Sequence, residues 1–239
     1  MPRTDLSWRT VRPAEGFYTS LVEAADRYPV RTFLPTGYEP NYPYPLLVFM
    51  HGHGGNEEQS LRLAPRVSRR NYVAIGLRGP LLVGVRPDGR GCFSWGADGQ
   101  AGMAAEDYVF RAVEQTRRYY HVHSERIYLA GVCEGATMAY RFALAHPEKV
   151  AGVISLNGLL PRCGPAFGFR RVRGLKVFAG HGIANAVAPL ALARRDAKLL
   201  YTAGIDVKLN TYATTHRLHP EMLADANRWV MEQITGDVP

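Results

Sequence analysis

Short apolar runs alternate with longer amphipathic segments along most of the chain. Seven runs have the length and composition of strands, and they lie at 29–35, 44–50, 72–77, 126–131, 150–156, 175–180 and 205–212. Five longer segments are typical of helices, and they lie at 57–70, 103–120, 134–145, 190–203 and 220–234. Continuously apolar runs are expected where a strand is covered on both faces. The alternation therefore predicts an α/β fold, with a mostly parallel sheet and helices on both faces.

The two ends of this pattern are less regular. The run at 29–35 lies between prolines, which favours an early or edge strand in an N-terminal extension over residues 1–40. Residues 78–102 are rich in glycine and are expected to form a long loop, and loops of that length are commonly functional. Nothing else interrupts the pattern, so we expect residues 1–239 to form a single domain.

Composition is that of an ordinary globular protein. Hydrophobic residues make up 46% of the 239 residues and charged residues 21%. The N-terminus lacks the apolar stretch of a secretory signal, and no apolar run approaches the length of a membrane span. The three cysteines, Cys92, Cys133 and Cys163, are too few for a disulfide framework. These features predict a cytoplasmic protein with no membrane span.

The chain carries a formal net charge of +8. Its arginines are scattered, and the densest basic stretch lies at 169–176. A basic excess can indicate an acidic substrate or a nucleic acid. No nucleic-acid-binding motif accompanies the charge, so we expect a solvated basic surface and no nucleic-acid partner.

Candidate chemistry gathers at the ends of strands, where open parallel sheets place their active sites. The segment GVCEG at 131–135 lies between a predicted strand and a predicted helix, with Cys133 at its centre. Flanking glycines allow strand and helix to approach each other closely around a strained nucleophile. The helix N-terminus is also expected to favour a thiolate. A buried structural cysteine is the alternative, and the order of strand, turn and helix favours a nucleophile.

A glycine-rich turn, HGHGG at 51–55, follows the strand at 44–50. Such a loop can direct a backbone N–H group at an oxyanion, and we predict the N–H groups of His53 and Glu134 as the oxyanion-hole donors. A His-x-His pair can also bind a metal, but no further ligand with suitable spacing lies nearby. The sequence therefore predicts no metal site.

Two polar residues follow later strands in the order of a catalytic triad. Asn185 comes after the strand at 175–180, and His216 comes after the strand at 205–212. Chain order is then nucleophile, orienting residue and base, as in an α/β-hydrolase. Taken alone, Asn185 is equally explained as a turn former and His216 as a surface histidine. Their positions at successive strand ends favour the triad, and Asp206 is the alternative partner for His216.

These stretches together resemble the phospholipase/carboxylesterase branch of the α/β-hydrolases, which includes acyl-protein thioesterases and small bacterial esterases. The matching stretches are LVFMHGHGGNEE, GLRGP, RIYLAGVCEGATMAYRFALAHPEKVAGVISLNGLLP, VFAGHGIANAVAP and the run from LLYTAGIDV through TYATTHRLHPEML. They cover most of residues 44–230. The resemblance implies an α/β-hydrolase fold, a small-molecule ester or thioester substrate and no cofactor. Dimers are common in the family, which leaves a homodimer open.

The chain departs from the family pattern at three positions. It has Cys133 where the family usually has Ser, Asn185 where it usually has Asp, and Glu134 where it usually has Gln. A thiol is more acidic than a hydroxyl, so a Cys–His pair can operate with a neutral Asn, as in papain-like proteases. Dienelactone hydrolases, another group of α/β-hydrolases, resemble this chain in having Cys at the same turn, although they keep an Asp. The matched substitutions predict a hydrolase that acts through an acyl-thioenzyme.

A catalytically inactive protein that serves as a binding or interaction module is the alternative. Glu134 puts a negative charge beside the thiol, which raises the pKa of the thiol unless the carboxylate faces solvent or pairs with Arg. Sulfur is also larger than the oxygen for which a serine-type scaffold is shaped.

An apolar wall for a short acyl chain is predicted from four residues: Phe93, Trp95, Leu159 and Leu160. Trp95 resembles the Trp that borders the acyl site in the family, and core or lid packing is an equally good explanation. Cys92 and Cys163 also lie in segments after strands. We expect both to be inert, and the alternative is that one of them pairs with Cys133 on oxidation.

Overall fold

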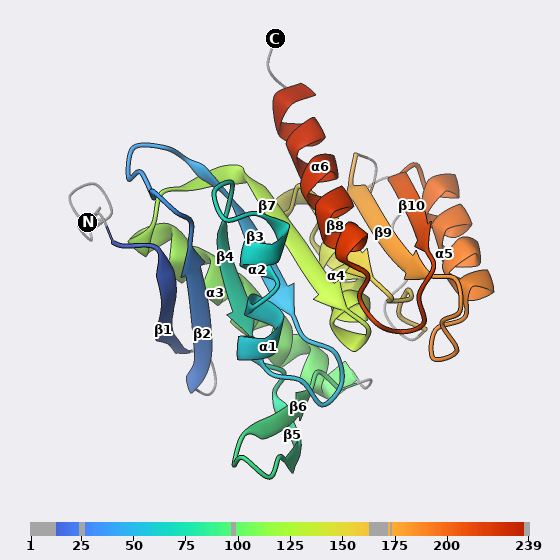
Figure 1. The fold of residues 1–239 in the computed structure, drawn as a ribbon, viewed down its shortest axis with the longest axis horizontal. Coiled ribbons are helices and arrows are strands. Elements are labelled where there is room, and N and C mark those ends of the chain that lie inside the picture. The colour runs from blue at the N-terminus through green and yellow to red at the C-terminus, as the bar shows by residue number, and fades with distance from the viewer. Residues whose placement is uncertain (1–12, 24–26, 97–98, 163–171, 173, 237–239) are drawn as a thin grey trace.

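Strands and helices alternate along the chain (Figure 1). The computed structural model describes residues 13–23, 27–96, 99–162, 172 and 174–236. Its strands are β1 (Gly16–Glu23), β2 (Arg27–Leu34), β3 (Tyr44–Met50), β4 (Val73–Leu77), β5 (Leu81–Val85), β6 (Gly91–Ser94), β7 (Val122–Val132), β8 (Gly152–Leu156), β9 (Lys176–Gly182) and β10 (Asp206–Tyr212). Its helices are α1 (Glu57–Leu61), α2 (Ala64–Val67), α3 (Gly99–Tyr119), α4 (Glu134–Ala145), α5 (Leu190–Thr202) and α6 (Pro220–Gly236), with a short 3-10 helix η2 at Pro147–Lys149.

The strands form an eight-stranded sheet in the order β1-β2-β4-β3-β7-β8-β9-β10. The pairs β1–β2 and β2–β4 are antiparallel, and all other neighbours are parallel. The carboxyl ends of the parallel strands therefore lie at one edge of the sheet. Segments that follow β3, β7, β8, β9 and β10 meet at that edge, which is where parallel sheets of this kind bind ligands.

Both faces of the sheet are covered by helices, which explains why all seven residues of β3 are buried. Leu46, Val48 and Met50 pack on one face with residues of α3 and α4. Leu47 and Phe49 pack on the other face with residues of α1, α2 and α6. Successive strand residues point to opposite faces, so a strand between two helical layers must be apolar at every position.

The predicted helix at 57–70 is wrong in its extent. The structure has two short helices there, α1 and α2, separated by Arg62 and Leu63. Pro65 lies in the first turn of α2. Proline has no N–H to donate to the preceding turn and its ring crowds the backbone there, so α1 cannot continue through it.

The predicted loop at 78–102 is also wrong in part. It contains a separate hairpin of β5 and β6, which projects from the sheet in Figure 1, and α3 already begins at Gly99. Residues 86–90 connect the two strands, and their turn contains Pro87-Asp88-Gly89, with φ +79° at Gly89. That tripeptide is a turn signal between two short apolar runs, and it predicts a hairpin.

At the N-terminal side, β2 accounts for the predicted strand at 29–35, but the edge strand is β1. Phe17, Thr19 and Leu21 of β1 are exposed, while Tyr18 and Ser20 are less so. Apolar residues therefore lie on both faces of β1, and its sequence lacks the alternation by which an edge strand is recognised.

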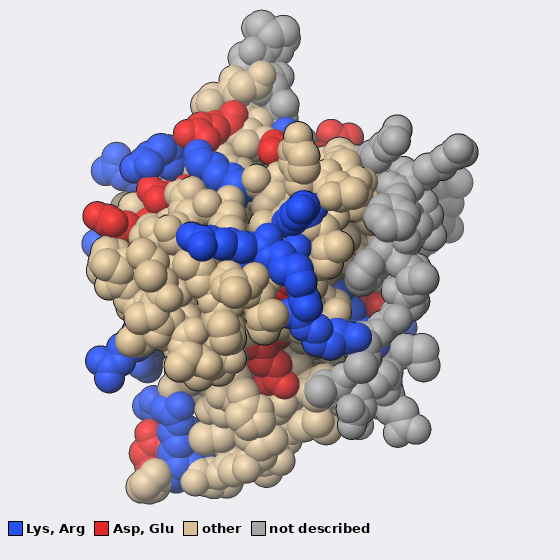
Figure 2. All heavy atoms as spheres, turned by 90° about the vertical axis from the view of Figure 1, so that its right-hand side faces the viewer, with Lys and Arg blue, Asp and Glu red and all other residues tan. Residues whose placement is uncertain are grey.

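The surface carries charges of both signs. Figure 2 shows basic side chains crossing the middle of one face, with acidic side chains above and below them. Among the helices that the structure describes, none is both long and apolar enough to cross a membrane.

The packing of α1 on β4 gives a first testable prediction. A Cβ atom at Gly76 would lie 2.5 Å from the Glu57 carbonyl oxygen and 2.8 Å from Leu61 Cβ. Gly76→Ala should therefore push α1 away from the sheet and lower the free energy of unfolding by about 1–3 kcal/mol, measured by urea denaturation. Gly84→Ala is the matched control, because its nearest neighbour, Cys92 Cβ, is 4.0 Å away. Equal urea midpoints for the two variants would contradict this packing argument.

Candidate active site

Cys133 occupies the turn between β7 and α4, with φ 54° and ψ −118°. Residues other than glycine rarely adopt a positive φ, so the turn is strained. A Cβ on Gly131 would lie 2.2 Å from the carbonyl carbon of Gly135, and a Cβ on Gly135 would lie 2.2 Å from the carbonyl oxygen of Met50. Both glycines are required by this close approach, which holds the partly buried thiol at the carboxyl edge of the sheet.

The turn at 51–55 passes directly beside Cys133. A Cβ atom at Gly52 would lie 3.2 Å from Cys133 Cβ. The backbone N–H groups of Glu134 and His53 both act on the Cys133 sulfur, and each lowers the pKa of the thiol. The structure thus brings together the two N–H groups named from the sequence. Donors that converge on a nucleophilic sulfur can also reach an oxyanion that forms on the carbon attached to it.

Asn185 and His216, from the segments after β9 and β10, are in contact. The His216 Nδ1 atom lies 3.0 Å from the amide oxygen of Asn185. The backbone N–H groups of Val187 and Ala188 donate to the same oxygen at 3.1 and 2.9 Å. Because N–H groups only donate, they orient the amide with its oxygen toward His216. Nδ1 of His216 must then carry the proton, which leaves Nε2 free to accept one.

Asn157, directly after β8, connects the two loops that carry this pair. Its side-chain NH₂ group donates to the carbonyl oxygens of His216 and Arg217 at 3.2 and 3.3 Å. Its amide oxygen accepts from the N–H of Gly182 at 2.8 Å and from Asn185 Nδ2 at 3.3 Å. Asn157 is fully buried and all its polar atoms are bonded, so it fixes the loops relative to each other.

Sequence reasoning did not identify Asn157 as part of the site. Its position in the sequence could have identified it, because it directly follows a buried central strand and so lies at the same edge of the sheet as Cys133 and His216. The preceding residue, Leu156, accepts the Cys133 N–H at 3.0 Å. The end of β8 therefore contacts both the cysteine turn and the histidine loop.

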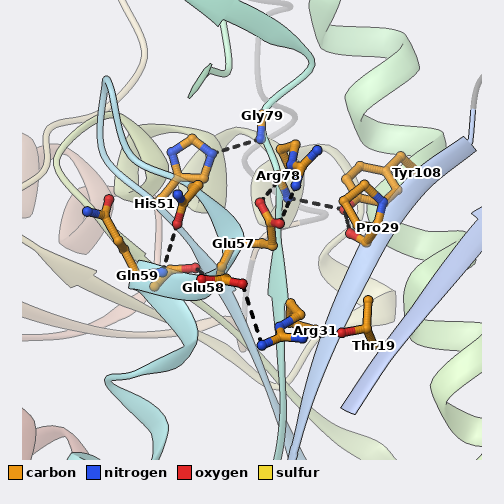
Figure 3. A network of polar contacts seen from close by, with 12 residues as sticks. Thr19, Pro29, Arg31, His51, Glu57, Glu58, Gln59, Arg78, Gly79 and Tyr108 are labelled. Carbon is orange, nitrogen blue, oxygen red and sulfur yellow. Dashed lines mark hydrogen bonds and ion pairs between the residues drawn. The ribbon is translucent and has the colours of Figure 1, made fainter. Parts of the chain in front are cut away.

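His51 fixes the base of the glycine-rich turn (Figure 3). The buried ring accepts the Gly79 N–H at Nε2, over 2.8 Å, and its Nδ1 lies 2.8 Å from the Gly52 carbonyl oxygen. Only a neutral ring with the proton on Nδ1 makes both hydrogen bonds. Burial lowers the pKa of His51, which keeps the ring in that neutral form.

An ion pair holds the segment that carries Gly79 (Figure 3). Arg78 Nε donates to one carboxylate oxygen of Glu57 at 2.7 Å, and its Nη2 contacts the other. The guanidinium carbon lies 4.5 Å from the centre of the Phe93 ring. The backbone N–H of Arg78 donates to the Tyr108 hydroxyl at 3.1 Å. These contacts connect α1, β6 and α3 to the glycine-rich turn.

The acid–base groups of the site are uncharged at rest. Burial raises the pKa of the Cys133 thiol and the Glu134 carboxylate raises it further, although the N–H groups of Glu134 and His53 oppose these effects. Burial lowers the pKa of His216, as does nearby His181. The N–H of Glu134 at the helix N-terminus does favour a thiolate, as expected, but burial outweighs it and the net shift is upward.

The Glu134 side chain is only partly exposed, and no arginine among the described residues pairs with it. Its Oε1 accepts from the Ser94 hydroxyl at 2.6 Å. Its Oε2 is buried without a hydrogen-bond partner among the described residues, and it lies 3.6 Å from His53 Nδ1. The carboxylate thus remains beside the thiol. This is the arrangement in which the charge of Glu134 raises the pKa of the thiol, as the inactive alternative assumes.

The predicted acyl wall is only partly supported. Trp95 has no exposed surface, and its indole N–H donates to the His51 carbonyl at 3.0 Å, while Leu160 is buried in the same core cluster. Assigning these two to an open wall is wrong, because both fill the core. Phe93 and Leu159 keep some exposure, and their contact with substrate stays a prediction. A 260 Å³ cavity does lie beside the site, lined by His53, Arg86, Val132 and Leu218 among others.

Among the described residues, the remaining sequence candidates do not form a further cluster. Cys92 is a free, partly buried thiol in β6, and Cys163 lies outside the described residues. His51 and His53 make separate contacts, one with backbone groups and the other with Glu134. Within the described ranges, no group of three His, Cys, Asp or Glu side chains is placed to hold a metal ion.

The strand order, the strained turn after β7 and the Asn–His contact at the carboxyl edge define an α/β-hydrolase fold. Residues 40–234 match the model of the Phospholipase/Carboxylesterase family, and the chain belongs to that family. The predicted fold class and family are thereby confirmed.

Known proteins agree with this assignment. A carboxylesterase from Mesorhizobium loti aligns over 89% of this chain and 98% of its own, with a TM-score of 0.70 and 20% identity. The Bacillus cereus carboxylesterase aligns over 90% and 94%, with a TM-score of 0.61 and 21% identity. NocK of Nocardia uniformis subsp. tsuyamanensis, an esterase by name, is 28% identical over 146 residues. That match covers 61% of this chain and 41% of NocK.

The neutral state of His51 predicts a specific loss of stability in acid. Because the pKa of His51 is lowered in the fold, below about pH 6.5 the unfolded chain binds a proton that the folded chain does not. Stability should fall with pH from there, by at most about 1.4 kcal/mol per pH unit for this group, until the pKa of the folded state is passed. Urea unfolding of wild type and His51→Gln between pH 7.5 and 5 measures the difference. Parallel pH profiles would contradict the assignment.

The charge of Glu134 predicts the reactivity of Cys133. Glu134→Gln keeps an acceptor for Ser94 and removes the charge that raises the thiol pKa. Alkylation of Cys133 by iodoacetamide at pH 7.5 should become several-fold faster, and its pH profile should move to lower pH. Mass spectrometry of the peptide containing Cys133 measures the rate, and Glu58→Gln on α1 is a control. Unchanged or slower labelling in Glu134→Gln would rule out the electrostatic effect.

Proposed function

We propose that this protein hydrolyses small carboxylic esters or thioesters with Cys133 as nucleophile, His216 as base and Asn185 as the residue that orients it. The observation that carries the proposal is the 3.0 Å contact between His216 Nδ1 and the Asn185 amide oxygen, at the sheet edge that also carries Cys133. It leaves Nε2 of His216 as the proton acceptor. Such a pair suits a thiol, which needs less assistance than a hydroxyl.

The reaction has two halves. His216 Nε2 takes the thiol proton as the sulfur attacks the carbonyl carbon, and the N–H groups of His53 and Glu134 stabilise the oxyanion. The carbon–oxygen or carbon–sulfur bond to the leaving group then breaks, and the imidazolium returns the proton to that group. Water, deprotonated by the same ring, attacks the acyl-thioenzyme. The acid leaves and the thiol is restored, so no cofactor takes part.

Two further observations support an esterase. The relatives described above are named as carboxylesterases or an esterase. The 260 Å³ cavity lined by His53 and by Val132, the residue before Cys133, offers room for a small acyl or alcohol group.

A second candidate is a catalytically inactive member of the family that binds a ligand or a protein. The buried carboxylate oxygen of Glu134 favours it, because it opposes both the thiolate and an oxyanion.

A burst experiment separates the two candidates. Rapid mixing with p-nitrophenyl acetate at pH 7.5 should release p-nitrophenol equal to the enzyme concentration, followed by a slower steady rate. Cys133→Ala should remove the burst, and His216→Ala should slow it by about 10²–10⁴-fold. Cys92→Ala should keep it, which controls for acylation of another thiol.

The result that overturns the proposal is equally definite. If wild type and Cys133→Ala release p-nitrophenol at the same rate, and a series of longer esters and thioesters gives the same equality, the binding protein becomes the better description.

A further inference from the structure

The amide of Asn157 has only one orientation that satisfies its neighbours. Its oxygen must face the N–H of Gly182, 2.8 Å away, and its NH₂ group must face the carbonyl oxygens of His216 and Arg217. In the reversed orientation the NH₂ group of Asn157 would face the N–H of Gly182, so that two donors would meet. Its oxygen would face the carbonyl oxygens of His216 and Arg217, so that acceptors would meet. The oxygen of Asn157 is therefore fixed toward Asn185.

The amide of Asn185 is fixed in the same way from its other side. Its oxygen accepts from Val187, Ala188 and His216, so its nitrogen must point at the Asn157 oxygen, 3.3 Å away. Asn157 is 0% exposed and Asn185 is 4% exposed. Both residues are thus locked in a buried amide pair, with one donor facing one acceptor.

We propose that Asn157 is a positioning residue that restricts position 185 to an amide, and so adapts the site to a neutral partner for His216. Its catalytic meaning rests on the proposed function, whereas the pairing itself is a property of the fold. An Asp at 185 would set a carboxylate oxygen against the Asn157 oxygen with no proton between them. Two buried acceptors in contact lose a hydrogen bond and leave both unsatisfied.

A proton taken up between the two oxygens would relieve this conflict. The group facing His216 would then again be neutral, so Asn157 enforces an uncharged partner whichever residue occupies position 185. A neutral partner does not raise the pKa of the imidazole, in agreement with the lowered pKa of His216. The same side chain also holds the backbone of His216 through its carbonyl oxygen.

The backbone at Asn157 offers a clean variant. Its φ is 55°, a conformation that Asn tolerates and Gly adopts freely. Asn157→Gly therefore removes the amide without adding backbone strain. Asn157→Ser is the second choice if the glycine variant is too unstable, because its hydroxyl can donate to a carboxylate.

A double-mutant cycle of wild type, Asn185→Asp, Asn157→Gly and the double variant tests the pairing. Asn185→Asp alone should lower the urea midpoint at pH 7.5, and the same change should cost much less once Asn157 is Gly. In the double variant the carboxylate can ionise, so the pH titration of His216 by ¹⁵N NMR should move up by about one pH unit or more relative to Asn185→Asp alone. A merely structural role for Asn157 would not move that titration.

Asn71→Asp is the matched control. Asn71 Nδ2 also donates to an amide oxygen, that of Asn227 at 3.2 Å, but it precedes β4 at the opposite edge of the sheet. It should leave the titration of His216 unchanged.

The inference would be overturned if Asn185→Asp lowered the urea midpoint equally with Asn157 present and with Asn157 replaced by Gly, and if His216 titrated at the same pH in both. Neither measurement needs turnover, so the outcomes are separable. Coupling without a burst of p-nitrophenol would leave the pairing intact and reject the proposed function. A burst in wild type, together with additive effects in the double-mutant cycle, would support the proposed function and reject the pairing of Asn157 with Asn185.

Discussion

The first turn of α4 lies directly against the end of β3, and the site is arranged around that contact. It is possible only because residue 135 is glycine, whose missing Cβ would lie 2.2 Å from the Met50 carbonyl oxygen. The contact brings the N–H of Glu134 next to the turn that follows β3, so that it and the N–H of His53 reach the same sulfur. It also requires the positive φ at Cys133, whose own N–H is satisfied by Leu156. Strain at the turn is thus borne by the packing of three strands and a helix.

Burial at this edge then determines the charge state of the groups in the site. It raises the pKa of Cys133 and lowers that of His216, so both shifts favour the neutral form of the side chain. The residue that orients the histidine is neutral as well, and its amide is bonded at both ends within the fold. A carboxylate at that position would favour the imidazolium, which a hydroxyl nucleophile needs more than a thiol does. Cysteine and asparagine are therefore consistent parts of one arrangement.

The sequence predicted those parts of the molecule whose constraints are local. Strands such as β3 are apolar at every position because both faces are covered, and the glycines around Cys133 are spaced by the turn they must form. Strand order placed Asn185 and His216 at one edge of the sheet. It left open whether Asn185 or another residue, such as Asp206, contacts the ring, and the structure shows Asn185 there. The edge strand β1 has apolar residues on both faces and gave no periodic signal. Trp95 and Asn157 were misjudged or missed because their roles depend on partners far away in the chain, His51 and the loops after β9 and β10.

Glu134 has opposite effects through its backbone and its side chain. Its N–H supports the sulfur and its carboxylate raises the thiol pKa. For each unit by which a thiol pKa rises, the thiolate population below that pKa falls tenfold, while each thiolate becomes about threefold more nucleophilic. From the raised pKa we expect the Cys133 thiol to react slowly with oxidants and alkylating agents in free solution. Under the proposed function, a carbonyl compound bound with its oxygen at the two N–H groups would escape that penalty, because proton transfer to His216 and bond formation would occur together. The carboxylate would in this way exchange general reactivity for selectivity toward a bound acyl group.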